Sequence, residues 1–236
     1  MREAPLKTTA YNQGILTTST TAKEKLGTLR ILEDGRKFRY AKAGAAIAAG
    51  QAVSCALVAA QHLGAIVASI NSSGTQVALT VTAGLALAND ALAGAMLHVT
   101  SGTGAGRSYR AESSTAITAA GTSITFALVD RLAIYDGTTR ISVVPSPWSG
   151  VLVGAANAAA AGVAPVAVAS GSYFWSQVSG PASALIVGTP AVGSPVILGA
   201  AGAVAVITAA TSLAIGYAFG SVGIAGEYKP VMLTLE

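Results

Sequence analysis

Apolar and polar residues alternate along several short segments of this chain. In residues 76–82, 123–128 and 230–235 every second side chain is apolar and large. A period of two is typical of strands that bury one face, because successive side chains of a strand point to opposite sides. Strand patterns recur about every ten residues between turns that contain Gly or Pro, and this spacing favours a sandwich or a barrel.

Three hairpins are predicted from strand patterns that flank turn residues. Lys25–Leu32 and Arg36–Lys42 flank Glu33-Asp34-Gly35, and the Asp-Gly pair supplies the positive φ that a tight turn needs. Residues 131–135 and 139–144 flank a second Asp-Gly pair, and we expect them to form the best hairpin of the chain. Met96–Thr100 and Tyr109–Glu112 flank the third, Gly-rich turn.

Residues 44–70 are rich in Ala, which favours a helix, but Gly44, Gly50 and Gly64 interrupt the segment. We therefore expect short strands around residues 53–58 and 64–70. The segments 47–53, 87–92 and 190–196 each show an apolar residue, a turn with Gly or Asp, and an apolar strand start. This pattern fits duplicated half-barrels and, equally, a turn that commonly precedes strands.

No charged residue occurs between Ile141 and Gly226, yet this stretch does not fit a membrane helix. A spanning helix needs about 20 mostly apolar residues without interruption, whereas Pro and Gly cut this stretch into strand-length pieces. We predict an all-β fold: a β-barrel or β-sandwich body with an extended N-terminal arm. The arm covers residues 1–24, a β-rich domain covers 25–150, and residues 151–236 form a β-rich C-terminal part that can belong to the same domain.

Charge is scarce and uneven. Charged residues make up 10% of the chain, against roughly 25% in ordinary soluble domains. A surface with few charges keeps copies apart poorly, so an oligomer or a larger lattice is expected to cover it. Nine of the fourteen basic residues lie in the first 42 positions, but acids are interleaved with them. This mixture favours a solvated hairpin over nucleic-acid binding. The Thr-rich arm lacks a core of its own, and we expect another subunit to hold it.

Candidate catalytic and metal-binding residues are few. Residues 102–108 contain three Gly but lack the Lys of a phosphate-binding loop, so we interpret them as a hairpin tip. Cys55 and His62 could act together in a hydrolase only with an orienting acid. Cys55, the one cysteine, lies in an apolar run and is expected to be buried and inert. We expect no enzyme activity, no cofactor and no metal site.

An aromatic cluster stands at Tyr173-Phe174-Trp175. Strand alternation would point Tyr173 and Trp175 to one face and Phe174 to the other, which favours a core on one face and an interface on the other. An exposed platform for sugar, built by Tyr173, Trp175 or Trp148, is the alternative.

Three passages of the chain form a pattern of turns and strands. They are Leu29–Gly44, a hairpin leading into an Ala/Gly-rich strand; Ser172–Ala182, an aromatic strand that ends in Gly-Pro; and the closing strands at 215–218 and 226–233. In these passages the chain resembles the capsid decoration (cement) proteins of tailed phages. The resemblance implies a β-barrel or sandwich that oligomerises, commonly as a trimer, and clamps neighbouring capsid subunits. It carries no catalytic residues.

These observations predict a non-enzymatic virion protein that stabilises a capsid by binding the major capsid protein and its own copies. Its expected place is the capsid surface, and neither nucleic acid nor membrane is an expected partner. The residues expected to contact a partner are Arg30, Arg36, Lys37, Arg39, Tyr40, Tyr173 and Trp175. A tail-tube, baseplate or fibre protein and a carbohydrate-binding or adhesin module remain alternatives.

Overall fold

The computed structural model describes residues 10–56, 65–71, 73–84, 86–133, 135–156, 158–207, 213–220 and 225–236. Within these ranges the chain forms strands β1 to β16 and one short 3-10 turn, η2 (Ala200–Gly202), without an α-helix. Six of the strands close into a barrel. The prediction of an all-β, barrel-containing body is therefore confirmed.

The chain folds as two compact units that differ from the predicted division. Among the described residues, one unit comprises 65–146, and the other comprises 10–56 together with 147–236. Residues 25–150 therefore contribute to both units, and residue 150 lies inside a strand. The sequence hid this arrangement because an insertion leaves the strand pattern on both sides unchanged.

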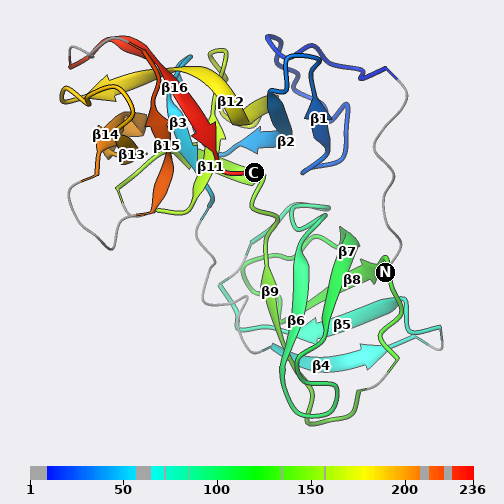
Figure 1. Cartoon of the computed structure of the whole chain (residues 1–236). Helices are drawn as coiled ribbons and strands as arrows, with labels where there is room; N and C mark the ends of the chain where they lie inside the picture. Colours follow the sequence, from blue (N-terminus) through cyan, green and yellow to red (C-terminus); the bar gives the residue numbers. More distant parts are fainter. Residues whose placement is uncertain are drawn as a thin grey trace. The chain divides into compact units, whose positions relative to one another are not determined.

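The inserted unit is a closed barrel with strand order β4-β5-β8-β7-β6-β9 (Figure 1). Its strands are β4 (Ala65–Ile70), β5 (Gln76–Thr80), β6 (Met96–Ser101), β7 (Ser108–Ser114), β8 (Ser123–Leu128) and β9 (Arg140–Val144). The alternating residues predicted to be buried fill its core: Val77, Leu79, Val81, Ile124, Phe126 and Leu128. The hairpin predicted for 131–135 and 139–144 is wrong, because the described residues of 131–135 form no strand and β9 pairs with β4 and β6 instead.

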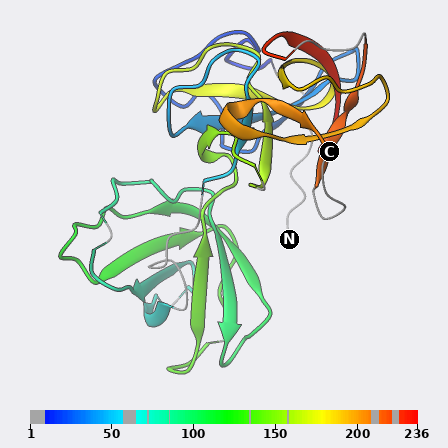
Figure 2. The same cartoon turned by 90° about the vertical axis from the view of Figure 1, so that its left-hand side faces the viewer.

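The second unit, drawn from two directions in Figures 1 and 2, contains two closed rings of paired strands that share one long strand. Its strands are β1 (Leu29–Ile31), β2 (Lys37–Ala43), β3 (Ala52–Ser54), β10 (Ser149–Val153), β11 (Ala160–Val163), β12 (Tyr173–Val187), β13 (Pro195–Leu198), β14 (Val204–Val206), β15 (Ala214–Ala218) and β16 (Tyr228–Thr234). The N-terminal ring is β2-β10-β3-β11-β12, closed by the β2–β12 pairing. The C-terminal ring is β12-β14-β13-β15-β16, closed by the β12–β16 pairing.

The two rings have the same connectivity. In chain order, the first strand of each ring pairs in parallel with the third and antiparallel with the fifth. The second strand pairs antiparallel with the third and the fourth, and the fourth pairs antiparallel with the fifth. Strand β12 spans 15 residues and acts as fifth strand of one ring and first strand of the other. Each ring encloses a core of small and branched side chains.

The turn before the second strand is also repeated, down to its hydrogen bonds. In the N-terminal ring the Gly50 N–H donates to the Ala164 carbonyl at 2.7 Å, and the Ala164 N–H donates to Gln51 at 2.9 Å. In the C-terminal ring Gly193 donates to Ala218, and Ala218 donates to Ser194, both at 2.9 Å. Gly50 and Gly193 have φ of 74° and 82°, a conformation that favours glycine. The duplication suggested by segments 47–53 and 190–196 therefore appears in the structure as an equivalent pair of turns.

The inserted barrel carries features of this turn at two places, around Gly94 and in the predicted segment 87–92. Gly94 donates to Ala111 at 3.0 Å, Ala111 donates to Ala95 at 2.8 Å, and Gly94 has φ of 79°. Residues 87–92, which the sequence pattern named, share further features with 47–53. The Asp90 N–H donates to the Ser114 carbonyl at 2.8 Å, as Gly50 does to Ala164, and Leu87 bridges Ile117 as Ile47 bridges Val168. Asp90 also has a positive φ of 60°, so the predicted similarity of 87–92 to 47–53 is confirmed at the level of the turn.

Candidate partner-binding surface

The residues predicted to contact a partner do lie together, on β1, β2 and the start of β12. Strand β1 pairs with β2, and β2 pairs antiparallel with β12 so that Tyr40 stands opposite Trp175 and Lys42 opposite Tyr173. The predicted hairpin of residues 25–42 is confirmed by this β1–β2 pair. The side chains that β2 and β12 direct away from the N-terminal ring form an aromatic cluster with partners from residues 10–32.

The centre of this aromatic cluster is closed to any partner. Tyr40 and Trp175 both have an exposed fraction of 0%. Their ring centroids lie 5.0 Å apart, and Tyr11 meets Trp175 edge-on at 5.2 Å. The assignment of Tyr40 and Trp175 to partner contact is therefore wrong. Trp175 is likewise not an exposed sugar platform. Phe174, on the opposite face, is buried in the N-terminal ring, so the predicted core is confirmed.

Gln13 fastens the N-terminal segment onto this cluster. Its side-chain amide donates to the Thr17 and Tyr173 carbonyls at 2.7 and 3.0 Å, and its amide oxygen accepts the Tyr40 hydroxyl at 2.7 Å. Its backbone carbonyl accepts bonds from the Trp175 indole and from Arg30. Residues 10–24 are thus held by the chain's own body, and the expectation that another subunit holds them is wrong for this part. Residues 1–9 of the predicted arm lie outside the described residues.

The three arginines of the predicted site serve internal contacts. Arg30 donates to Gln13 at 2.9 Å and lies over the Tyr11 ring at 4.7 Å. Arg36 forms an ion pair with Asp34 at 2.7 Å. Hydrogen bonds from the Arg36 backbone and side chain hold the pKa of Asp34 below its ordinary value.

Arg39 and Tyr173 also have partners within the chain. Arg39 pairs with the Glu236 carboxylate at 2.7 Å, and this contact joins β2 to the C-terminus. Tyr173 is half-buried; its ring stacks on Tyr40 at 5.9 Å, and the Lys42 ammonium lies 5.4 Å from its centroid. Arginine in such paired and stacked positions contributes to packing as well as charge.

Free positive charge on this unit comes from lysines beside the predicted site. Lys23 and Lys25 are exposed and Lys37 is half-buried. None of the three forms an ion pair with another residue that the structure describes. Lys37 is therefore the one predicted contact residue whose charge is free for a partner, and Lys23 and Lys25 extend the surface around it.

The remaining candidate chemistry resolves into turns and strand contacts. Residues 102–108 form the tip between β6 and β7, as predicted. His98 Nδ1 meets the Ser108 hydroxyl at 2.7 Å on the paired strands. Asp136 accepts hydrogen bonds from Thr103 and Thr138, which hold its pKa below the ordinary value. Each of these polar side chains therefore has a contact within a turn or between paired strands.

Cys55 is half-buried beside the core of the N-terminal ring, and burial raises the pKa of its thiol. A raised pKa reduces the thiolate that nucleophilic chemistry needs. His62, its suggested partner, lies outside the described residues. In the described part of the chain, three or more His, Cys, Asp or Glu side chains do not gather at any point that could hold a metal ion.

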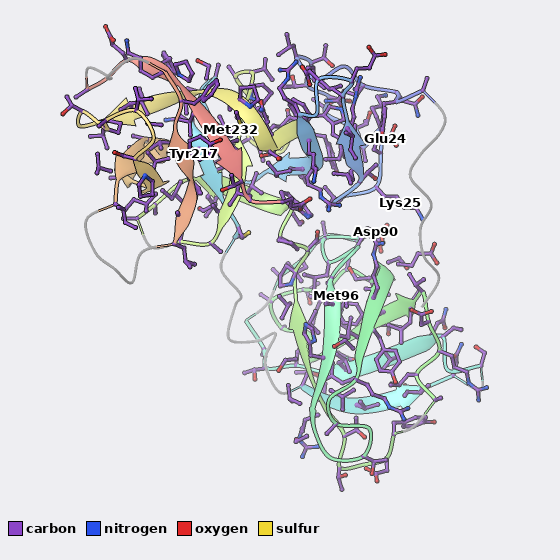
Figure 3. The ribbon with its side chains drawn as sticks, viewed as in Figure 1. Glu24, Lys25, Asp90, Met96, Tyr217 and Met232 are labelled. Carbon is purple, nitrogen blue, oxygen red and sulfur yellow. The ribbon has the colours of Figure 1, made fainter. Side chains whose placement is uncertain are left out.

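Sequence patterns missed an exposed apolar face on the C-terminal ring. Tyr217 on β15 and Met232 on β16 stand opposite each other in the paired strands and are labelled in Figure 3. Phe219 and Tyr228 are 48% and 52% exposed. The alternation in 214–219 and 228–232 could have located these residues, but it does not tell which face of a strand is covered.

No family model matches the chain, and neither a curated protein nor a solved structure is detectably similar to it. A helix with the length and apolar character needed to cross a membrane does not occur in the described ranges.

Proposed function

We propose that this protein is a non-enzymatic structural component of a virus particle that decorates and stabilises a capsid shell. The observation that supports this proposal is that the surface exposes large apolar side chains and carries few charges. Among the described residues, six of the eleven large apolar side chains that are well exposed belong to the segments 187–192, 213–219 and 228. The first two segments lie within residues 141–226, a stretch of 86 positions without a charged residue, and residue 228 follows it closely. Exposed apolar patches mark surfaces that other protein covers, and a surface with few charges favours association.

The mechanism of stabilisation is contact area shared among several weak sites. A specific protein contact buries about 1,600 Å² in total. A decorating protein that touches both shell subunits and its own copies binds with higher avidity than any one contact supplies. Two rings that share β12 give a continuous body on which separate surfaces can serve the shell and the neighbouring copy.

We assign the shell contact to Lys23, Lys25 and Lys37, because none of these lysines forms an ion pair with a described residue and an acidic shell surface is a suitable partner. Complementary charge of this kind mainly raises the association rate and makes binding sensitive to salt. The major capsid protein is the proposed partner. The other residues predicted for this contact have partners within the chain. Arg36 and Arg39 pair with Asp34 and Glu236. The rest bond to Gln13 of the N-terminal segment: Arg30, Tyr40, Tyr173 and Trp175.

The test is co-sedimentation of the purified chain with shells assembled without it. Replacing the three lysines by Glu is expected to abolish binding, whereas the parent binds and is released by salt. Replacing Arg107, Arg110 and Arg131 by Glu makes the same change in charge on the inserted barrel and is expected to leave binding intact. Failure of the parent to bind shells would refute the proposed function.

A tail-tube, baseplate or fibre protein is the second candidate, because an uncharged face that fits its own copies also suits a polymer. A tube or fibre protein forms rings or filaments on its own, whereas a decoration protein forms small oligomers that bind preassembled shells. Electron microscopy of the purified chain at high concentration distinguishes these two outcomes.

A further inference from the structure

Each of the two equivalent rings has an outer surface on its first and fifth strands. In the N-terminal ring other residues of the chain cover this surface, whereas in the C-terminal ring much of it is exposed. Tyr173 opposite Lys42 in the N-terminal ring corresponds to Tyr228 opposite Leu185 in the C-terminal ring. The next outward pair, Trp175 opposite Tyr40, corresponds to Pro230 opposite Ser183. These positions form the outer face of the first and fifth strands in each ring.

In the N-terminal ring this outer face is covered by the chain itself. The side chains that pack on it are those of Tyr11, Ile15, Leu26 and Leu32. The Ser19 N–H donates to the Tyr173 carbonyl at 3.1 Å, and the Tyr173 N–H donates to the Ser19 carbonyl at 2.7 Å. The result is full burial of Tyr40 and Trp175. A face of this position is therefore built to carry a second layer of protein.

In the C-terminal ring the turn at Gly50 touches the equivalent face at one edge: the Leu185 N–H donates to the Gly50 carbonyl at 2.9 Å, and Gly50 lies against the Tyr228 ring. This contact leaves much of the face exposed. Tyr228 and Val187 are 52% and 45% exposed, and Tyr217, in the row next to Met232, is 38% exposed. Figure 3 shows Tyr217 and Met232 on neighbouring strands of this ring. We define the apolar face as the outward apolar residues of β12, β15 and β16 together with Phe219, which follows β15: Pro181, Leu185, Val187, Tyr217, Phe219, Tyr228, Pro230 and Met232.

We propose that a second copy of this chain covers the apolar face, so that the protein self-associates through the outer surface of β12, β15 and β16. Strands β12 to β15 carry no charged residue. The two charges at the start of β16, Glu227 and Lys229, pair with each other at 2.8 Å. Two copies that meet through this face therefore bring no like charges together. A charged partner, in contrast, would find no unpaired charge on these strands with which to form an ion pair.

The composition of the apolar face agrees with this occupant. Aromatic residues and Met are enriched in the buried centres of protein interfaces. A specific interface buries about 1,000 Å² or more and involves roughly 20–30 residues a side, so a face of these few outward residues is small for a stable dimer. We expect self-association that depends on concentration rather than an obligate dimer. The biological role of this contact rests on the proposed function, since neighbouring copies on a shell would join through it.

The experiment compares the full-length parent with two variants, Tyr217→Lys and Phe219→Lys, by sedimentation velocity over a range of concentrations. Each variant is expected to weaken self-association by about 100-fold or more, because an unpaired ammonium would be buried in the contact. Tyr135→Lys is the matched control, since Tyr135 is 43% exposed on the inserted barrel. It is expected to associate like the parent. Urea denaturation curves verify that the variants are folded.

A parent that stays monomeric throughout, or folded variants that associate as well as the parent, would overturn the inference. Self-association without shell binding would leave the inference standing and refute the proposed function. If the chain binds shells but remains monomeric in solution, and Tyr217→Lys leaves shell binding unchanged, the proposed function stands and the inference of self-association is refuted.

Discussion

Replacement of Gln13 by Ala is expected to release the N-terminal segment and destabilise the two-ring unit. The substitution removes three side-chain hydrogen bonds, two donated to the Thr17 and Tyr173 carbonyls and one accepted from the Tyr40 hydroxyl. Each such bond contributes about 1 kcal/mol net. The Tyr40 hydroxyl would in addition lose its only described acceptor inside a cluster where its residue is fully buried.

The expected loss is about 2–4 kcal/mol in the free energy of unfolding, at the upper end where the buried hydroxyl finds no water. Tryptophan fluorescence in urea is a suitable assay, because both tryptophans, Trp148 and Trp175, belong to this unit. With a typical dependence on denaturant, the midpoint should fall by about 1–2 M urea. Thr17→Ala is the control: its side chain is exposed and makes one local bond, so we expect a change within about 0.5 kcal/mol.

A double-mutant cycle with Tyr40→Phe tests the specific bond. Removing both partners should cost less than the sum of the two single changes, by about 1 kcal/mol or more. A Gln13→Ala protein as stable as the Thr17→Ala control would refute the reasoning that this side chain holds the segment. The same contacts mean that deletion of residues 1–24 would uncover Trp175, so such a deletion cannot by itself test a role in partner binding.

Three further predictions follow from local contacts. A Cβ at Gly216 would lie 2.0 Å from the Met232 carbonyl oxygen. We therefore expect Gly216→Ala to cost about 3 kcal/mol or more, and to lower the tryptophan fluorescence midpoint if β12 couples the two rings, whereas Gly137→Ala, which meets nothing within 4 Å, should be nearly neutral. Hydrogen bonds, that from Thr103 first, lower the folded pKa of Asp136 from 3.8, so this carboxylate stabilises the fold above that pH, and the contribution is lost as the pH falls through the folded pKa. Asp136→Asn should therefore flatten the acid limb of a stability-versus-pH curve; an unchanged limb would contradict this account. Burial raises the pKa of Cys55, so its thiol should react with a disulfide reagent at pH 8 more slowly than it does in urea, and equal rates would show that it is accessible.

Strand positions could be predicted from the sequence wherever one face of the strand is buried and the other is exposed to solvent. The segments 76–82 and 123–128 became β5 and β8 because their alternating apolar residues fill one barrel core. The strands of residues 52–54 and 65–70 were also located despite their Ala content. The predicted pairing of residues 131–135 with 139–144 is wrong, because an Asp-Gly turn does not determine which strands pair with β9.

The candidate site could be located from the sequence but not interpreted from it. Basic and aromatic residues of β1, β2 and β12 do converge, yet alternation cannot tell that residues 10–32 cover the outward face of Tyr40 and Trp175. Arg30 and Arg39 look like surface charges in the sequence, and only the fold shows that Gln13 and Glu236 accept their hydrogen bonds. Long-range contacts of this kind leave no local signal.

The repeated ring explains why one chain carries both a sealed face and an open one. Each ring offers an outer surface on its first and fifth strands, and β12 contributes to both surfaces with different halves of its length. The N-terminal half of β12 places aromatic side chains under residues 10–32, whereas the C-terminal half places Pro181, Leu185 and Val187 at the surface. Residues 10–32 cover the first of these surfaces. We propose that the second surface keeps its apolar residues for a second copy of this chain, because the absence of charge along β12 to β15 leaves no like charges to meet between two copies.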